Sequence, residues 1–213
     1  SPLKLLSRRV PWRFPGDELS VDPHHVRLTE LDLSENNLRA LPPGFLCPVG
    51  NLQVLNLTHN RIRSAENLGF MDMTCNGGSE LQVLDASHNE LRSIPENWGI
   101  SRLRRLQHLN LQFNNITELS GETLAGLSSL RIVNLSFNHL ETLPEGLFAG
   151  SKELREIHFS NQLTEVPDAL QDLSMLRTLD LGENQIRTFK NGSFRSLHQL
   201  TGLRLIDNQI GNI

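Results

Sequence analysis

The chain has 213 residues, a formal net charge of −4 at pH 7 and 38% hydrophobic residues. This weak acidity gives no reason to expect nucleic acid or an anionic membrane as a partner. No run approaches the roughly 18 apolar residues of a membrane span, and the start, SPLKLLSRRV, is too short for the apolar core of a signal peptide. If a parent protein is secreted or anchored in a membrane, we expect those segments to lie outside this sequence.

Residues 1–27 contain no clear repeat. Scattered apolar residues, including Trp12 and Phe14, are followed by a stretch rich in Pro, Gly and Asp, and no pair of cysteines marks a disulfide-stapled cap. We interpret this segment as a degenerate first repeat or the remnant of a cap.

From Leu28 onward an eleven-residue motif recurs. Its copy at Leu130, LRIVNLSFNHL, has apolar residues at places one, four, six and eleven, and asparagine at place nine. The copies begin at Leu28, Leu52, Leu81, Leu106, Leu130, Leu154, Leu176 and Leu200. The usual step is 24 residues, within the 20–29 range of leucine-rich repeats. The pattern predicts an α/β solenoid: a leucine-rich-repeat right-handed horseshoe with a concave parallel β-sheet and an irregular convex side.

The alternation within each motif assigns its places. Places four and six point into the core, and places three and five point outward on the concave face. The asparagine at place nine turns the chain out of the strand, where its amide can satisfy backbone groups of adjacent turns. We therefore expect a structural role for Asn36, Asn60, Asn89, Asn114, Asn138, Asn184 and Asn208.

The second unit is longer than the others and contains a loop rich in Gly and Asn at 71–78. Cys75 in this loop and Cys47 in the preceding unit are the only cysteines. A disulfide between them would close a loop of roughly 28 residues and add ~3 kcal/mol of stability. Two separate buried thiols are the alternative interpretation.

The unit at Leu154 is shortened. Only Ser160 separates Phe159 from Asn161, whereas the other copies have two residues there. Because deleting one residue should pull the asparagine turn out of register, we expect a junction after Phe159 or Ser160, from which a longer segment is missing. The expected domains are repeats at 28–159 and a later block of repeats at 160–213. The last unit stops at Ile213 in mid-repeat, so we also expect the chain to be a piece of a longer array.

Four sequons favour a secreted protein: those of Asn56, Asn115, Asn134 and Asn191. All four fall at places that the pattern predicts to be exposed. Asn56 and Asn134 occupy place five, so glycans there would cover part of the concave face. A protein ligand would then use a flank or the uncovered repeats.

Catalytic motifs are absent from the sequence, so the candidate site residues are those of a binding surface. Phe113 and Phe137 share place eight in neighbouring units and are expected either to form an exposed aromatic pair or to pack against the next coil. His59 and His88 also occupy place eight and form either a pH-sensitive pair or two solvated residues; a metal site would lack a third ligand.

Arginines at place two form a predicted basic row: Arg131, Arg155 and Arg177. We expect Glu156 and Asp180 to lie beside them and reduce their mutual repulsion. The row suggests either an acidic partner or a mixed, solvated face.

Two loops carry a resemblance to a known family. The stretch from LCPVGNLQVLNLTHN to the DMTCNGG loop resembles the N-terminal ectodomain of insect Toll receptors, in the subgroup with long ectodomains. The likeness extends through Phe159. Residues 160–213, with LRTLDLGENQIRTF and LTGLRLIDNQIGNI, resemble a block many repeats further along.

The resemblance implies the extracellular part of a single-pass type I receptor at the cell surface. Its implied partners are a dimeric Spätzle-type cystine-knot cytokine and a second receptor copy, with N-linked glycans and no cofactor. The implied roles are signalling in innate immunity and development, by recognition and not by catalysis. The competing class is a leucine-rich-repeat adhesion or matrix protein.

Overall fold

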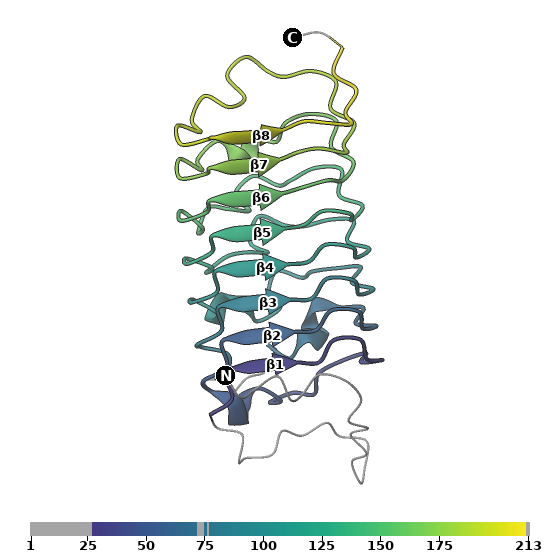
Figure 1. The fold of residues 1–213 in the computed structure, drawn as a ribbon, viewed down its shortest axis with the longest axis vertical. Coiled ribbons are helices and arrows are strands. Elements are labelled where there is room, and N and C mark those ends of the chain that lie inside the picture. Colours follow the sequence, from purple (N-terminus) through teal and green to yellow (C-terminus); the bar gives the residue numbers. More distant parts are fainter. Residues whose placement is uncertain (1–26, 72–74, 76, 212–213) are drawn as a thin grey trace.

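The computed structural model of the protein describes residues 27–71, 75 and 77–211. The predicted degenerate repeat or cap remnant at 1–27 therefore lies outside the described residues, apart from its last position. Figure 1 shows the described chain wound into a stack of similar turns, each contributing one strand to the same face.

Eight strands form one parallel sheet in sequence order, as the repeat predicts. Each strand spans places three to five of its motif. The strands are β1 (Glu30–Asp32), β2 (Val54–Asn56), β3 (Val83–Asp85), β4 (His108–Asn110), β5 (Ile132–Asn134), β6 (Glu156–His158), β7 (Thr178–Asp180) and β8 (Gly202–Arg204).

The register between strands is constant, so each place of the motif becomes a row across the sheet. Leu109 of β4 pairs with Val133 of β5, and Val133 pairs with Ile157 of β6. The place-four residues form a buried apolar row from β1 to β7, and the same row is 41% exposed at Leu203 in β8, where no further turn covers it.

The convex side is built from turns and short 3₁₀ helices. These are η2 (Cys47–Val49), η3 (Ala65–Leu68), η4 (Ile100–Arg102) and η5 (Asp168–Leu170). The described residues include no α-helix, which agrees with the irregular convex side expected from the sequence. The leucine-rich-repeat solenoid is confirmed.

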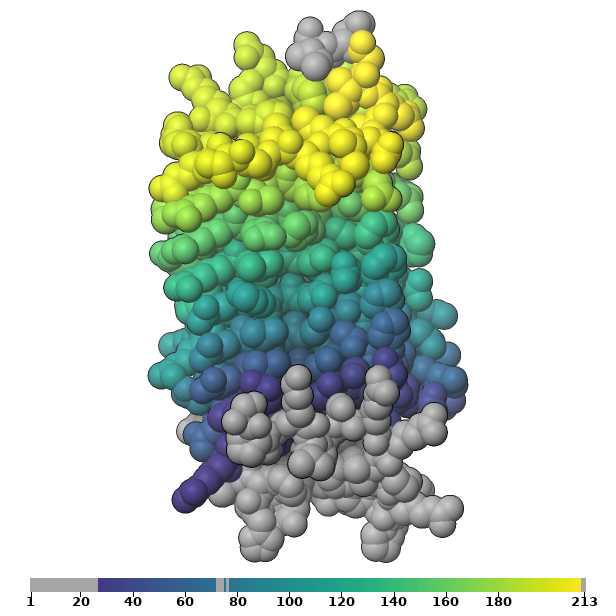
Figure 2. All heavy atoms as spheres, in the orientation of Figure 1, coloured from purple at the N-terminus to yellow at the C-terminus, as the bar shows by residue number. Residues whose placement is uncertain are grey.

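The core runs the length of the stack between the sheet and the convex side. Leu130, Val133, Leu135 and Leu140 are fully buried, as their places predict. Burial of one such side chain stabilises the fold by about 1.5–3 kcal/mol. In a repeat array this apolar surface is covered mainly by the turns directly above and below. Figure 2 shows the successive turns stacked in sequence order, with their colours grading from one end of the molecule to the other.

The place-nine asparagines bond adjacent turns to one another. Asn138 Nδ2 donates to the carbonyl of Leu111 in the preceding turn at 3.0 Å and to that of Leu135 in its own turn at 3.0 Å. Its Oδ1 accepts the backbone N–H of Ile116 at 3.0 Å. These hydrogen bonds confirm the structural role that the sequence predicts for the asparagines.

The shortened turn differs from the expectation that a missing residue displaces the asparagine. Asn161 Nδ2 still donates to Leu135 O at 2.9 Å, and its Oδ1 still accepts Leu140 N–H at 3.3 Å. What is lost is the bond to the carbonyl of its own turn: Phe159 O accepts Asn184 Nδ2 of the next turn, whereas Leu111 O in an intact turn accepts both its own Asn114 and the next turn's Asn138. The chain tolerates the shorter turn by keeping the bonds to the preceding turn.

Cys47 and Cys75 form a disulfide, with their Cα atoms 5.6 Å apart. It ties the loop of the longer second unit to η2 of the first, which is the pairing expected from the sequence. Over 27–71, 75 and 77–211, no helix has the length and apolar character needed to span a membrane.

Candidate ligand-binding surface

The outward row at place five makes the middle of the concave face polar. It contains Asp32, Asn56, Asp85, Asn110, Asn134, His158, Asp180 and Arg204. Most of these side chains also close the turn that follows: Asn134 Oδ1, for example, accepts the backbone N–H of Ser136 at 3.0 Å. The row therefore has a local structural role and faces any ligand that enters the concave side.

The sequons differ in how open their asparagines are. Asn115 and Asn191 are exposed, whereas the side chains of Asn56 and Asn134, which lie on the sheet, are half-buried. Asn134 Nδ2 donates to Gln112 Oε1 at 2.9 Å. The expectation that all four are freely exposed is thus wrong for the two on the sheet, because side chains of neighbouring strands in register flank them.

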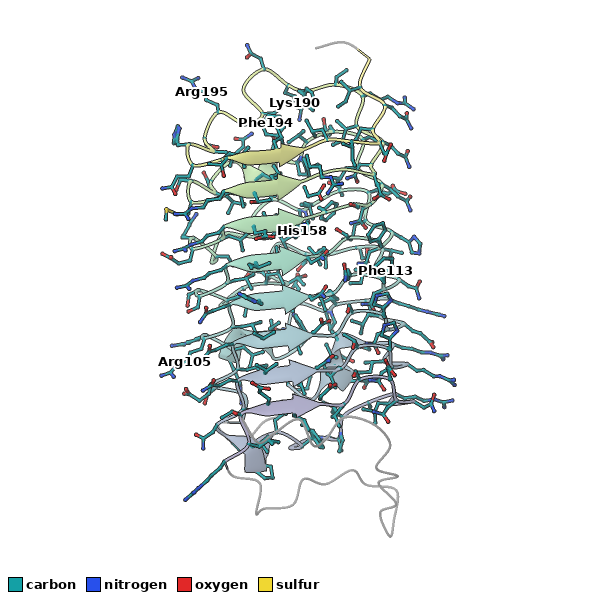
Figure 3. The ribbon with its side chains drawn as sticks, in the orientation of Figure 1. Arg105, Phe113, His158, Lys190, Phe194 and Arg195 are labelled. Atoms are coloured by element: carbon teal, nitrogen blue, oxygen red, sulfur yellow. A yellow bond between two sulfur atoms is a disulfide. The ribbon has the colours of Figure 1, made fainter. Side chains whose placement is uncertain are left out.

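Four rings stack along the edge of the sheet at place eight. The ring centroids are 4.2 Å apart between His59 and His88, 4.4 Å between His88 and Phe113, and 4.4 Å between Phe113 and Phe137. The planes are within 18° of parallel. We call these four residues the aromatic ladder; Figure 3 shows Phe113 at the edge of the sheet opposite Arg105.

The aromatic ladder joins the histidine pair and the phenylalanine pair, which were predicted from the sequence as two separate features. The two phenylalanines stay exposed, at 41% for Phe113 and 39% for Phe137, so they form the outward pair and not a packing contact with the core. The contact between His88 and Phe113, which links the pairs, was missed. His88 and Phe113 share place eight in successive units, and this shared place could have predicted their contact.

The backbone conformation at place eight is unusual. All four ladder residues have a positive φ, between 52° and 56°. This left-handed conformation costs a non-glycine residue about 1–2 kcal/mol, and each aromatic contact returns roughly 0.5–1.5 kcal/mol. Stacking therefore offsets part of the cost of placing bulky rings in these turns.

Burial and the neighbouring imidazole lower the pKa of His88. Desolvation is the larger cause and the charge of His59 the second, and together they outweigh the opposing effect of Asp85. His88 is therefore held in its neutral form at pH 7, which suits a stacked ring.

The place-two arginines lie side by side, each directly before one of the adjacent strands β5, β6 and β7. The backbone N–H of Arg155 donates to Arg131 O, and that of Arg177 donates to Arg155 O, each at 2.8 Å. Arg131 contacts Gln107 Oε1 at 3.3 Å, while Arg155 Nε is shielded from water and meets no acceptor among the described residues.

The acidic residues expected beside this row bond elsewhere. Glu156 Oε1 lies 2.7 Å from His158 Nε2, and Asp180 Oδ2 lies 3.8 Å from Arg204 Nη1. The expectation that Glu156 and Asp180 offset the arginine row is wrong, because both belong to the outward rows on the sheet, where His158 and Arg204 are closer partners.

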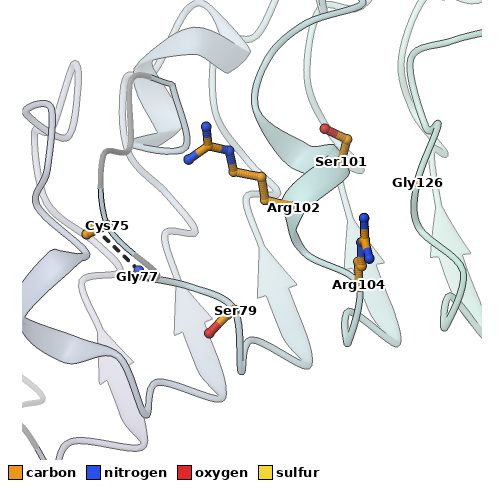
Figure 4. A pocket seen from close by; sticks show the side chains of 7 residues that line it. All are labelled: Cys75, Gly77, Ser79, Ser101, Arg102, Arg104 and Gly126. Atoms are coloured by element: carbon orange, nitrogen blue, oxygen red, sulfur yellow. Dashed lines mark hydrogen bonds between the residues drawn. The ribbon is translucent and has the colours of Figure 1, made fainter.

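A hollow lies on the far side of the turns, beside η4. Arg102, Arg104, Ser79 and Ser101 line it, and the backbone N–H of Gly77 donates to Cys75 Sγ at 3.4 Å at its rim (Figure 4). In the described part of the chain, no three His, Cys, Asp or Glu side chains are grouped so that they could hold a metal ion.

Comparisons with known proteins identify the class first. The profile described as "Leucine rich repeat" matches residues 26–75, 104–163 and 160–210, and one described as "Leucine Rich repeats (2 copies)" matches residues 79–121. The chain belongs to the leucine-rich repeat family.

Individual relatives narrow this class. Toll-like receptor 7 of Drosophila melanogaster is 65% identical over an alignment of 367 positions that covers 99% of this chain and 25% of the receptor. The transforming growth factor beta activator LRRC33 of Danio rerio is 28% identical, over 77% of this chain and 24% of that protein. The chain thus spans about a quarter of the length of these relatives. The predicted likeness to an insect Toll ectodomain is confirmed.

Solved structures agree with the fold. The crystal structure of a TLR13–ssRNA13 complex matches with a TM-score of 0.78 and 28% identity, covering 87% of this chain and 26% of that one. A leucine-rich-repeat protein of Leptospira interrogans matches with a TM-score of 0.72 and 29% identity, covering 91% of this chain and 48% of that one.

Proposed function

We propose that this chain is the ligand-recognition part of a Toll-type receptor at the cell surface, and that it binds a Spätzle-type cystine-knot cytokine. Binding of the dimeric cytokine would bring two receptor copies together, and the signal would serve immunity or development. The observation that carries the proposal is the 65% identity to an insect Toll-like receptor over nearly the whole chain.

Features of the chain support an extracellular protein ligand. The Cys47–Cys75 disulfide suits an oxidising compartment. Asn115 and Asn191 are exposed sequon positions, and glycans on them would leave the middle of the sheet open. A Danio rerio relative is named an activator of transforming growth factor beta, which also favours a protein partner.

An RNA ligand, such as the ssRNA13 of the TLR13 complex, is less well supported. The chain carries a net charge of −4. The place-five row contains three aspartates and one arginine. Nucleic-acid binding depends on neutralising phosphates with Lys and Arg, and this face does not offer that excess.

The test is direct binding. The 213-residue chain, secreted between capping repeats that cover its two ends, would be titrated with purified Spätzle-type cytokine, and its stoichiometry measured by sedimentation. We expect saturable binding with two receptor chains per cytokine dimer. No cytokine binding, together with homophilic association of the capped chain, would instead favour the adhesion class.

A further inference from the structure

The aromatic ladder is an exposed apolar strip that the core does not need. Phe113 and Phe137 are exposed and lie outside the buried core cluster. The turn does not require a ring at this place, because Glu35 has the same left-handed backbone, at a φ of 55°, in the first turn. Since the rings stack face to face, the strip presents their edges to solvent. A contiguous apolar strip of this kind is typical of a surface that another group covers.

A sequon lies directly beside this strip. In the sequence Phe113-Asn114-Asn115-Ile116-Thr117, the acceptor Asn115 follows Phe113 by two residues. Asn114 and Ile116 are buried, whereas Phe113, Asn115 and Thr117 are exposed on the same flank. Because two residues of chain span at most about 7 Å, a sugar attached to Asn115 Nδ2 begins next to the Phe113 ring.

The backbone of this sequon is held in place by the turns on both sides. The Phe113 N–H donates to Ser136 O at 3.0 Å, and the Asn115 N–H donates to Leu91 O at 2.8 Å. The side chains of Asn115 and Thr117 make no hydrogen bond within the described residues. The amide is therefore open to modification, and a sugar on it starts from a fixed position beside the ring, at little further cost in entropy.

The other sequons lack this combination. The amide of Asn134, on the sheet, donates to a glutamine of the preceding turn at 2.9 Å. Asn191 is exposed and also follows a phenylalanine by two residues, but Phe189 packs against the core and meets Phe194 edge-on at 5.7 Å. Among the sequons of the described residues, Asn115 combines an open amide with an exposed strip of rings.

The charge beside the ladder does not select a charged partner. Arg61, Arg63 and Arg92 are exposed on this flank, and Glu90 is bonded to Arg63 at 2.9 Å. N-acetylglucosamine, the first sugar of an N-linked glycan, is neutral and therefore indifferent to this mixture. Its C–H groups and acetamide methyl can bury apolar ring surface, and its oxygens suit the partial positive charge of ring edges.

We infer that Asn115 carries an N-linked glycan whose first N-acetylglucosamine lies across the exposed edges of Phe113 and Phe137. This goes beyond the proposed function and rests only on the secretion that the function entails, not on the identity of the ligand. The aromatic ladder is then covered by the chain's own glycan. The polar place-five row in the middle of the sheet remains the open surface for a protein ligand.

The modification is a group transfer from a lipid-linked oligosaccharide donor. A bond forms between Asn115 Nδ2 and the anomeric carbon of the first sugar. The bond from that carbon to the diphosphate of the lipid breaks, and the amide loses one proton. The product keeps a neutral amide, so the charge of the flank does not change.

The test uses the capped 213-residue chain secreted from insect cells. Glycopeptide mass spectrometry should find Asn115 occupied, and hydroxyl-radical footprinting should find Phe113 and Phe137 protected. Thr117→Ala removes the sequon but keeps Asn115, and it should raise the oxidation of both rings severalfold. Trimming the glycans with an endoglycosidase that leaves a single N-acetylglucosamine should keep the rings protected.

Stability provides a second measurement of the same contact. Thr117→Ala should lower the unfolding midpoint by about 2–4 °C. The shift should be smaller in a Phe113→Ser background, because the sugar then has less ring surface to cover. The matched control is Asn191→Gln, which removes an exposed sequon far from the ladder and should leave the oxidation of Phe113 and Phe137 unchanged.

The outcomes separate this inference from the proposed function. An unmodified Asn115 beside a glycosylated Asn191 would overturn the inference alone. An occupied Asn115 with equal oxidation of the rings in the wild type and in Thr117→Ala would also overturn it, because the strip would then be open. A wild-type chain with protected rings that binds no cytokine would instead refute the proposed ligand and support the glycan contact.

Discussion

At the scale of single residues, the place-nine asparagines stabilise the fold more than their small side chains suggest. Asn138 is 5% exposed and satisfies the carbonyls of Leu111 and Leu135 and the N–H of Ile116. Replacing it with alanine leaves the Ile116 N–H without its partner, at about 1–3 kcal/mol for a group that water cannot reach. The carbonyls of Leu111 and Leu135 keep the bonds from Asn114 Nδ2 and Asn161 Nδ2. We expect Asn138→Ala to lower the free energy of unfolding by roughly 1–3 kcal/mol, measured by urea denaturation.

Asn36 offers the matched control for that substitution. It is exposed, and its two amide bonds within the described residues stay inside its own turn, to Leu33 O and Ser34 O. Asn36→Ala should therefore cost clearly less than Asn138→Ala. Equal losses for the two variants would show that bonds between turns contribute nothing beyond the local turn.

His88 makes the ladder sensitive to acid. Its pKa is lowered below 6.5 mainly by burial, then by His59. Because the pKa of His88 is lower in the folded chain, its imidazole binds a proton more tightly in the unfolded chain. The stability that this contributes is fully present above pH ~6.5 and is lost as the pH falls toward the folded pKa. The charged groups on its own strand, turn and flank include Asp85, Glu90 and Arg92, and those on the flank of the preceding turn include Arg61 and Arg63.

The corresponding measurement is an NMR titration of the histidines together with unfolding at pH 7.5 and 5.0. We expect a His88 pKa below 6.5, and a larger loss of stability on acidification in the wild type than in His88→Gln, which cannot titrate. A His88 signal that titrates above 6.5 would contradict the interpretation. His59→Gln should raise the pKa of His88, because it removes the second cause of the shift.

At the scale of elements, the close approach of two turns beside η4 depends on a glycine. Gly99 has a φ of +87°, and a Cβ added to it would collide with the carbonyl oxygen of Phe70 in the preceding turn. The contact sits beside the edge-on packing of Phe70 against the fully buried Trp98. Gly99→Ala should therefore cost more than the ~1–2 kcal/mol of the left-handed backbone alone.

Gly50 is the control for this element. It has a φ of −56°, and nothing lies within 4 Å of an added Cβ. Gly50→Ala should change the free energy of unfolding by no more than about 0.5 kcal/mol. Thermal or urea unfolding of the two variants side by side decides the point, and a Gly99→Ala protein as stable as Gly50→Ala would show that the turns can separate at little cost.

The strands and the core were predictable from the sequence because every unit repeats one inward pattern. Places one, four, six and eleven specify buried residues wherever a parallel neighbour exists, and the register follows from equal steps. The clash at Gly99 was not predictable, because it depends on the distance between two turns and not on either turn alone. The partners of Glu156 and Asp180 were predicted wrongly for the same reason. Their nearness in sequence to the arginine row did not show that the His158 and Arg204 side chains lie closer to them.

The candidate surface was only half predictable. The shared place eight brought His59 to His88 and Phe113 to Phe137, but exposure of the rings could not be derived from spacing. The left-handed backbone turns these side chains outward along the edge of the sheet, and that conformation is visible only in three dimensions. The sequence likewise could not tell that Asn56 and Asn134 are partly covered by neighbouring strands.

At the scale of the whole molecule, the shortened turn at Ser160–Asn161 shows how the array accommodates a change in repeat length. Repeat arrays are stabilised by contacts between neighbouring turns, so a block can be removed if the two faces that then meet are alike. Asn161 illustrates this tolerance, since it keeps its bonds to the turn of Leu135 and Leu140. The loss of a whole number of repeats plus one residue would leave this local arrangement.

We propose that the parent protein contains further repeats between Phe159 and Asn161. The alignment with the Drosophila receptor runs over 367 positions although this chain has 213 residues, which supports a block present in the relative and missing here. Amplifying the parent transcript between the codons of Leu130 and Leu200 should therefore yield a product longer than this chain encodes, with the reading frame conserved on both sides. A product of the shorter length alone would contradict the junction.

In that case one deleted residue accounts for the shortened turn. Inserting glycine after Ser160 should then stabilise the array, because glycine accepts the left-handed backbone required at place eight and the insertion restores the bond from Asn161 to its own turn.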